Sequence, residues 1–169
     1  DEKNLFMKAY GTADMKPKTM YTKVARIGVE SKRNQGAFET KVSPDGSKIL
    51  IYVENPFEKK EFDRFGIKVF DKDLAKIWDG DIVMPYSDQE FRMEQMLVDN
   101  DGSVVCVGVK YAIKQERRER KREGQVPYDY HVLVYWKGQE KPVDETLNVK
   151  DKFLQDLTLT LGTEGDVLC

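Results

Sequence analysis

A short pattern that occurs three times constrains the fold of this chain more than any other feature. In each copy an acidic residue and a glycine stand between two apolar-rich runs, and the copies occupy 42–50, 98–106 and 161–168. Glycine supplies the positive φ that the tight turn of a hairpin needs. The turn residues are Asp45 and Gly46 in the first copy, Asp101 and Gly102 in the second, and Glu164 and Gly165 in the third. Such a recurrence indicates a repeat architecture.

Alternating and apolar-rich runs around these turns predict antiparallel strands, four in each repeat. The run 48–53 is almost continuously apolar, as expected for a strand covered on both faces. Residues 5–10 and 20–27 predict a further strand pair before the first repeat, and 154–161 opens the third repeat. The strands expected in the two complete repeats are 38–43, 48–53, 65–70 and 74–84, then 95–98, 104–109, 130–136 and 142–149.

Four consecutive antiparallel strands are the composition of a β-propeller blade. Ser43-Pro-Asp-Gly-Ser-Lys-Ile49 resembles the SPDG blade motif of TolB-like and other WD-like propellers, whereas the second copy has Asp99-Asn100 in place of Ser-Pro. The resemblance implies an all-β chain of about three blade equivalents, and a bacterial periplasmic or cell-surface location. The expected units are a half blade over 1–37, blades over 38–93 and 94–153, and a half blade over 154–169. The resemblance implies no activity, because propellers host unrelated functions.

Three blade equivalents are fewer than the four or more with which propellers close. We therefore expect either that the chain is a piece of a longer protein or that its open ends pair with a second copy. The partners expected are another protein, the remainder of the same polypeptide, or a second copy in a homodimer. An alternative is a two-sheet β domain in which the repeat reflects hairpin chemistry alone.

The overall charge argues against two classes of partner. Lys and Arg number 28 against 30 Asp and Glu, a net charge of −2, which gives no general attraction to nucleic acid or anionic membranes. No apolar run approaches the roughly 20 residues that cross a bilayer.

The two cysteines are too few for a disulfide framework, and Cys106, among valines, is expected to be a small buried apolar residue.

The stretch 114–123 is the most unusual by composition, with six basic and three acidic residues. Glu116 and Arg120 are four residues apart, which favours a short solvated helix. The stretch is either a solvated insertion or a protein-contact element. Its own acids and its lack of aromatic residues argue against nucleic acid. The candidate binding residues are Arg117, Arg118, Arg120 and Arg122, together with Phe57 and Phe62 in the corresponding connection of the first repeat.

Catalytic signals are few. The carboxylates at 71, 73, 79 and 81 stand in turn or strand positions where Asp is expected for backbone reasons. His131 is the only histidine, and its alternation places it on one strand face with Leu133 and Tyr135. We expect no catalytic residue, no metal and no cofactor. The function expected is a non-catalytic binding or scaffold module; the alternative is a segment of a propeller-type hydrolase whose active site other blades complete.

Overall fold

The computed structural model describes residues 1–31, 34–56, 64–87, 89–147, 157–164 and 166–168. Strands dominate this part of the chain, and one short helix interrupts them. The strands are β1 (Glu2–Met7), β2 (Thr22–Gly28), β3 (Ala37–Val42), β4 (Lys48–Glu54), β5 (Arg64–Asp71), β6 (Lys76–Val83), β7 (Phe91–Val98), β8 (Val104–Tyr111), β9 (Tyr128–Tyr135), β10 (Val143–Leu147), β11 (Thr160–Leu161) and β12 (Val167–Leu168); the helix is α1 (Lys114–Arg122). No helix in these residues reaches the length and apolarity needed to cross a membrane.

The strands form two four-stranded antiparallel sheets and two strand pairs. The first sheet has the order β3-β4-β5-β6 and the second β7-β8-β9-β10, so each strand pairs with the next along the chain. β1 pairs with β2, and β11 with β12. The all-β prediction is confirmed, and no sheet closes on itself in the described residues. β7 begins at Phe91, so the expected boundary between 93 and 94 falls inside that strand.

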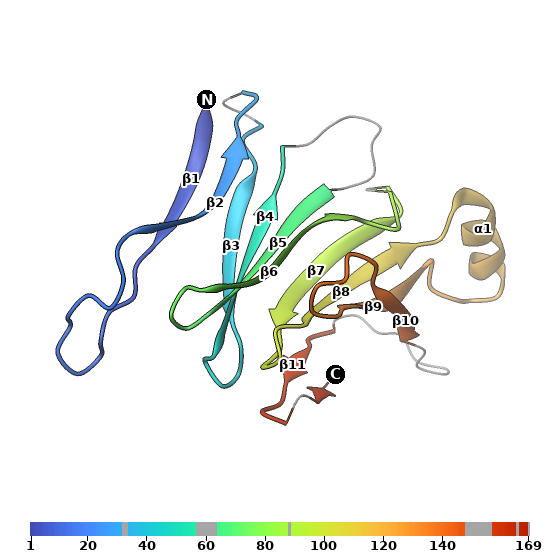
Figure 1. Cartoon of the computed structure of the whole chain (residues 1–169). Helices are drawn as coiled ribbons and strands as arrows, with labels where there is room; N and C mark the ends of the chain where they lie inside the picture. Colours follow the sequence, from blue (N-terminus) through green and yellow to red (C-terminus); the bar gives the residue numbers. More distant parts are fainter. Residues whose placement is uncertain (32–33, 57–63, 88, 148–156, 165, 169) are drawn as a thin grey trace.

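Three apolar layers hold the sheets together in chain order, and Figure 1 shows β1–β2, the first sheet and the second sheet side by side in that sequence. The largest layer lies between the two four-stranded sheets and includes Leu50, Ile67, Cys106 and Leu133. The layer between β2 and the first sheet contains Val24, Ala25, Ile27, Ile51, Val53 and Phe70. The far face of the second sheet is covered by Leu159 and Leu161. The inner strands of each four-stranded sheet are therefore covered on both faces, whereas β3 and β10 are largely exposed.

The second strand of each sheet shows why its sequence is almost continuously apolar. In β4, Leu50 faces the second sheet and Ile51 faces β2, and both side chains are fully buried. In β8 all residues from Val104 to Val109 are buried. Strands covered on both faces lose the apolar–polar alternation of half-exposed strands. The prediction that 48–53 is covered on both faces is confirmed.

The repeated turns lie between the first and second strands of each sheet. Gly46 and Gly102 have φ of 71° and 95°, the region that glycine adopts without a Cβ clash, and Gly165 lies outside the described residues. In the first turn the carboxylate of Asp45 accepts the backbone N–H of Ser47 at 2.8 Å. The hydrogen bond from the Ser43 hydroxyl is the main reason that the pKa of Asp45 falls to about 2. The carboxylates thus rigidify the turns.

Candidate functional site

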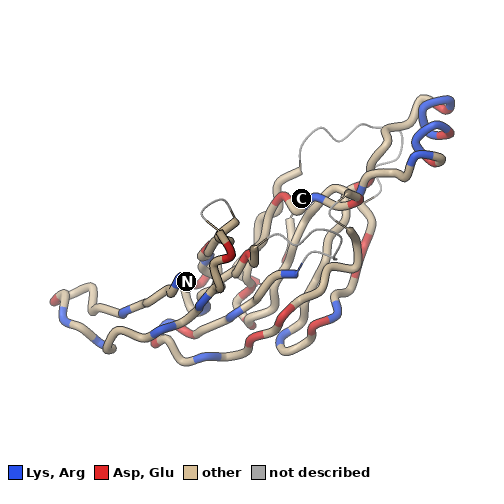
Figure 2. Tube along the Cα trace, turned by 90° about the horizontal axis from the view of Figure 1, so that it is seen from above, with Lys and Arg blue, Asp and Glu red and all other residues tan. Residues whose placement is uncertain are grey.

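The connection between β8 and β9 carries α1, a helix that extends beyond the sheets and consists largely of charged residues (Figure 2). None of its nine residues is buried. Glu116 lies in its first turn and basic residues fill its last, the distribution that the helix dipole favours. The helix ends before Gly124, which has a positive φ of 73°. The prediction of a short solvated helix is confirmed.

Contacts at its base fix α1 to the second sheet. The N–H of Ala112 donates to the carbonyl of Pro127 at 2.8 Å, so the pairing of β8 with β9 continues to the base of the connection. Arg120 reaches back to Asp129 with two hydrogen bonds, Nη1–Oδ1 at 2.9 Å and Nη2–Oδ2 at 2.6 Å. This two-pronged pair raises the pKa of Arg120 further, and it holds the helix in one orientation.

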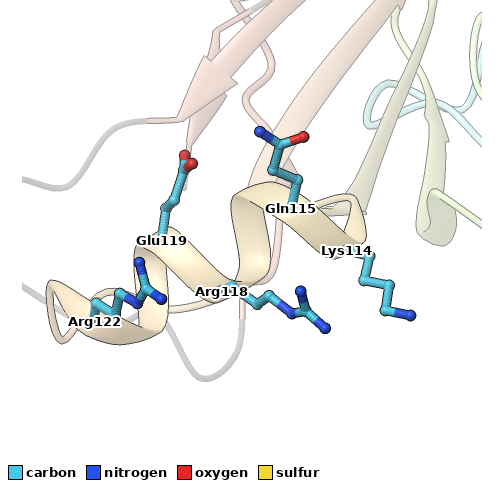
Figure 3. Close-up of a pocket in the computed structure, with 5 residues that line it drawn as sticks. All are labelled: Lys114, Gln115, Arg118, Glu119 and Arg122. Carbon is cyan, nitrogen blue, oxygen red and sulfur yellow. The ribbon is translucent and has the colours of Figure 1, made fainter.

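The four arginines expected to bind a partner do not act alike. Arg120 is bonded to Asp129, and Arg117 extends toward the carbonyl of Ala112, with its Nη2 3.4 Å from that oxygen. Arg118 and Arg122 are exposed and line an open hollow of about 550 Å³ (Figure 3). The other residues that line it are Lys114, Gln115 and Glu119. Phe57 and Phe62, the remaining candidate binding residues, lie outside the described residues.

A polar network lies on the face of the second sheet that faces the first sheet. His131 is only 6% exposed, and its Nδ1 lies 2.7 Å from Oδ1 of Asp144. The hydroxyl of Tyr86, in the connection from β6 to β7, donates to Oδ2 of Asp144 and lies 3.4 Å from the same His131 nitrogen. Burial and the bond to Asp144 raise the pKa of the Tyr86 hydroxyl above its ordinary value.

Rings and a cation hold Tyr86 in place. Its ring stacks on Phe91 with centroids 5.2 Å apart and planes 18° apart, and the ammonium of Lys110 lies 4.5 Å from its centroid. Gly108 provides the room, because a Cβ at that position would lie 2.2 Å from the Phe91 ring. The network therefore fastens the strand connection onto the second sheet. The structure places His131 on one strand face with Leu133 and Tyr135, as its alternation predicts, and shows in addition that it is buried.

Sequence reasoning did not find Tyr86 or Asp144 as partners of His131. His131 pairs in register with Thr146, so Asp144 is its diagonal neighbour two residues away on β10. Only the register of β9 and β10 reveals that relation, and the sequence pattern does not specify it. A histidine followed by a run of apolar strand residues is nevertheless a signal that a polar partner is needed.

The carboxylates of the first sheet serve local structure. Asp71 accepts the backbone N–H groups of Asp73 and Ala75, each at 2.9 Å, which closes the turn between β5 and β6. Asp79 lies between Lys76 at 3.0 Å and Lys68 at 3.3 Å, and its hydrogen bond to Lys76 is the main reason that its pKa is lowered. Within the described ranges, no group of three or more Asp, Glu, His or Cys residues is arranged to hold a metal ion.

The described geometry thus offers two features that bear on function, an anchored basic helix and a His–Asp–Tyr network around the buried His131. Comparison of the chain with protein-family models, with curated proteins and with solved structures gives no match, so its own residues carry the functional argument.

Proposed function

We propose that this chain is a non-catalytic binding module, in which packed antiparallel sheets serve as a rigid scaffold and α1 contacts a protein partner. The observation that carries the proposal is that α1 is anchored but buries nothing. A helix this short is only marginally stable by itself, and tertiary contacts normally stabilise a helix through a buried face. Here an ion pair and backbone bonds hold the helix while its surface stays open to solvent. That combination suits a contact element.

We propose further that the two four-stranded sheets are propeller-type blades. Each runs through four strands in sequence order, and each carries its acidic-Gly turn between the first and second strands. The sheets also stack face to face through one apolar layer. These features support the blade assignment without depending on the Ser43–Ile49 motif. A blade scaffold presents its strand connections at the two ends of the sheets, where a partner has access to them.

The two-stranded pairs β1–β2 and β11–β12 indicate what kind of partner could bind beside the four-stranded sheets. Among the described residues, β1 pairs as a strand only with β2 and β12 only with β11, so each pair has half the strands of the complete sheets. We propose that further strands complete these halves, either from the remainder of the polypeptide or from a second copy. Light scattering over a dilution series tests the second copy: a mass that stays at that of one chain at every concentration contradicts it.

The hydrolase alternative finds less support. It requires polar groups from several sheets to converge on one open point. The network of His131, Asp144 and Tyr86, of which only His131 is buried, comes from one sheet and the connection that leads into it, and its members bond to one another. Its internal bonds and the stacking of Tyr86 on Phe91 suit fastening of the connection rather than contact with a substrate. We therefore retain the binding function as the conclusion.

The proposed contact role of α1 can be tested without knowing the natural partner. Peptides from a random displayed library are selected against the chain and then measured against a variant in which 113–126 is replaced by a four-residue Gly/Asn turn. The bond between Ala112 and Pro127 keeps the strand ends adjacent, so this variant is expected to fold. Selected peptides should lose binding to it. Peptides that bind the variant equally well would contradict a contact role for α1.

A further inference from the structure

The charges of α1 are segregated around the helix. Successive residues are rotated by about 100°, so all six basic residues fall within one continuous arc of about 200°. Glu116 and Glu119 lie on the remainder, together with Gln115. Figure 3 shows Lys114, Arg118 and Arg122 directed to one side of the helix, and Gln115 and Glu119 to another. A merely solvated helix requires no such separation, and intermixed charges would stabilise it better.

The basic arc divides into an anchoring part and a free part. Arg120 and Arg117 turn toward Asp129 and Ala112 at the base of the helix. Within the part of the chain that the structure describes, no hydrogen bond or ion pair involves the side chains of the other four basic residues, and all four are exposed. These four are Lys114, Arg118, Lys121 and Arg122, and we call them the cation row. The anchoring part fixes the direction in which the cation row points.

The spacing of the cation row limits what it can bind. Lys114, Arg118 and Arg122 are four residues apart, which gives steps of about 6 Å and a total of about 12 Å along the helix axis. In an extended peptide, residues two apart are separated by about 6.6 Å and point to the same side. Carboxylates at alternate positions of an extended segment therefore meet the row one to one. Arginine can bind such carboxylates in a two-pronged manner.

We propose that the cation row binds an extended acidic segment of a partner protein, with Asp or Glu at alternate positions. This inference rests on the proposed binding function and names the chemistry of its partner. The hollow between the row and Glu119 admits small side chains at the intervening positions. A nucleic acid fits less well, because 113–124 contains no aromatic residue on which bases could stack.

The test measures fluorescence anisotropy with a labelled Glu-Ser repeat peptide of twelve residues, and with its Gln-Ser counterpart as the uncharged probe. The row variant carries Lys114→Gln, Arg118→Gln and Arg122→Gln. The control variant carries Lys72→Gln, Lys137→Gln and Lys141→Gln, which remove the same charge from exposed positions in the turns at the opposite ends of the strands. Both sets are at exposed sites, so circular dichroism should show both variants folded.

The row variant should bind the Glu-Ser peptide about tenfold more weakly than the parent, as expected from losing three exposed ion pairs. The control variant should stay within about twofold, and the Gln-Ser peptide should not bind. An equal loss in both variants, or no loss in either, overturns the proposal. So does tighter, row-dependent binding of a twelve-nucleotide oligo-dT, which would assign the row to nucleic acid.

The test of the cation row and the test of the proposed binding function can fail independently. If library-selected peptides require α1 but carry no acidic residues, the proposed partner chemistry is wrong and the contact role of α1 stands. If selected peptides bind independently of α1, the contact role fails whatever the Glu-Ser peptide does.

Discussion

The side chain of Asn100, in the turn of the second sheet, accepts a hydrogen bond from the backbone N–H of Asp45 at 3.1 Å, in the equivalent turn of the first sheet. Its Nδ2 donates at 2.9 Å to the carbonyl of Thr163, in the third copy of the same pattern. One amide therefore joins all three repeated turns. Trp78 adds a second link, because its indole N–H donates to the carbonyl of Gly102 at 2.7 Å. The turns thus define hairpins and also connect neighbouring sheets.

Replacing Asn100 with Ala should destabilise the chain, because the change removes both links between turns. The sites are exposed, so we expect a loss of about 1 kcal/mol in the free energy of unfolding, at the low end for two hydrogen bonds. Chemical denaturation measures it. Gln139→Ala in the exposed turn between β9 and β10 is the control and should be neutral. Equal stability of the two variants would show that the bonds from Asn100 contribute nothing.

Gly102→Val should destabilise the chain through backbone conformation. Gly102 has φ of 95°, and the atom nearest to an added Cβ is a methyl carbon of Val69 at 3.6 Å, so the Cβ itself would fit. A β-branched residue in this region costs about 1–3 kcal/mol. The matched control is Gly28→Val, where φ is not positive and nothing lies within 4 Å of an added Cβ. The measurement is thermal unfolding. If Gly102→Val unfolds at the same temperature as the parent, the turn assignment is wrong.

The local parts of this fold are predictable from the sequence. Alternation and the Asp-Gly pairs predict the strands and the two described turns, because both depend on neighbours a few residues apart. The start of β7 was missed: Gln95 to Val98 is apolar enough to be recognised, whereas Arg92 and Glu94 are exposed beside a register shift between Met93 and Gln95. Exposed charges in the first half of this strand obscure the alternation by which a strand is recognised.

The contacts of the candidate site are less predictable. The charged composition of 114–123 predicts a solvated helix, but the bond from Arg120 to Asp129 depends on how the helix folds back on β9. The partnership of His131 with Asp144 depends on strand register, and that with Tyr86 on the path of a connection 45 residues away in sequence. Phe57 and Phe62 remain predicted binding residues.

Cys106 should be unreactive until the chain unfolds. Its side chain is 1% exposed in the layer between the two sheets, and burial raises the pKa of its thiol, so little thiolate is available to react. In a Cys169→Ser background, labelling by a thiol reagent should therefore follow global unfolding across a denaturant series. Rapid labelling under native conditions, at a rate independent of denaturant, would show that the sheets separate locally.

Asp129→Asn should loosen α1 and leave the sheets intact. The pair with Arg120 is half-exposed, and such pairs contribute about 0.2–1 kcal/mol, so the free energy of unfolding should change by less than about 1 kcal/mol. Amide hydrogen exchange within 116–123 should nevertheless accelerate, because this pair is the main side-chain anchor of the helix. Glu140→Gln, an exposed change of the same charge, should leave exchange in α1 unaltered. Unchanged exchange in Asp129→Asn would place the anchor elsewhere.

The Tyr86 hydroxyl should make the chain sensitive to alkaline pH. Its pKa is higher in the folded state than in the unfolded chain, because burial and the Asp144 carboxylate disfavour the phenolate. The folded state therefore holds its proton more tightly, and the associated stability is complete below about pH 10 and is lost as pH rises through the folded-state pKa. Burial raises the pKa values of Tyr135 and Cys106 as well. A variant at position 86 keeps both groups, so its stability still depends on alkaline pH to some extent.

Tyr86→Phe isolates the contribution of this hydroxyl, because it keeps the ring stack on Phe91 and removes only the donor to Asp144. At neutral pH we expect a loss of about 1.5 kcal/mol, the low end for a hydrogen bond to a charged group, because Asp144 is exposed. Between pH 10 and 11 the free energy of unfolding should fall less steeply in Tyr86→Phe than in the parent, whereas Tyr21→Phe, at an exposed position, should match the parent slope. A double-mutant cycle with Asp144→Asn should show strong non-additivity, because both changes break the same bond. Parallel slopes in all three proteins, with additive losses, would mean that Tyr86 is held by its ring alone.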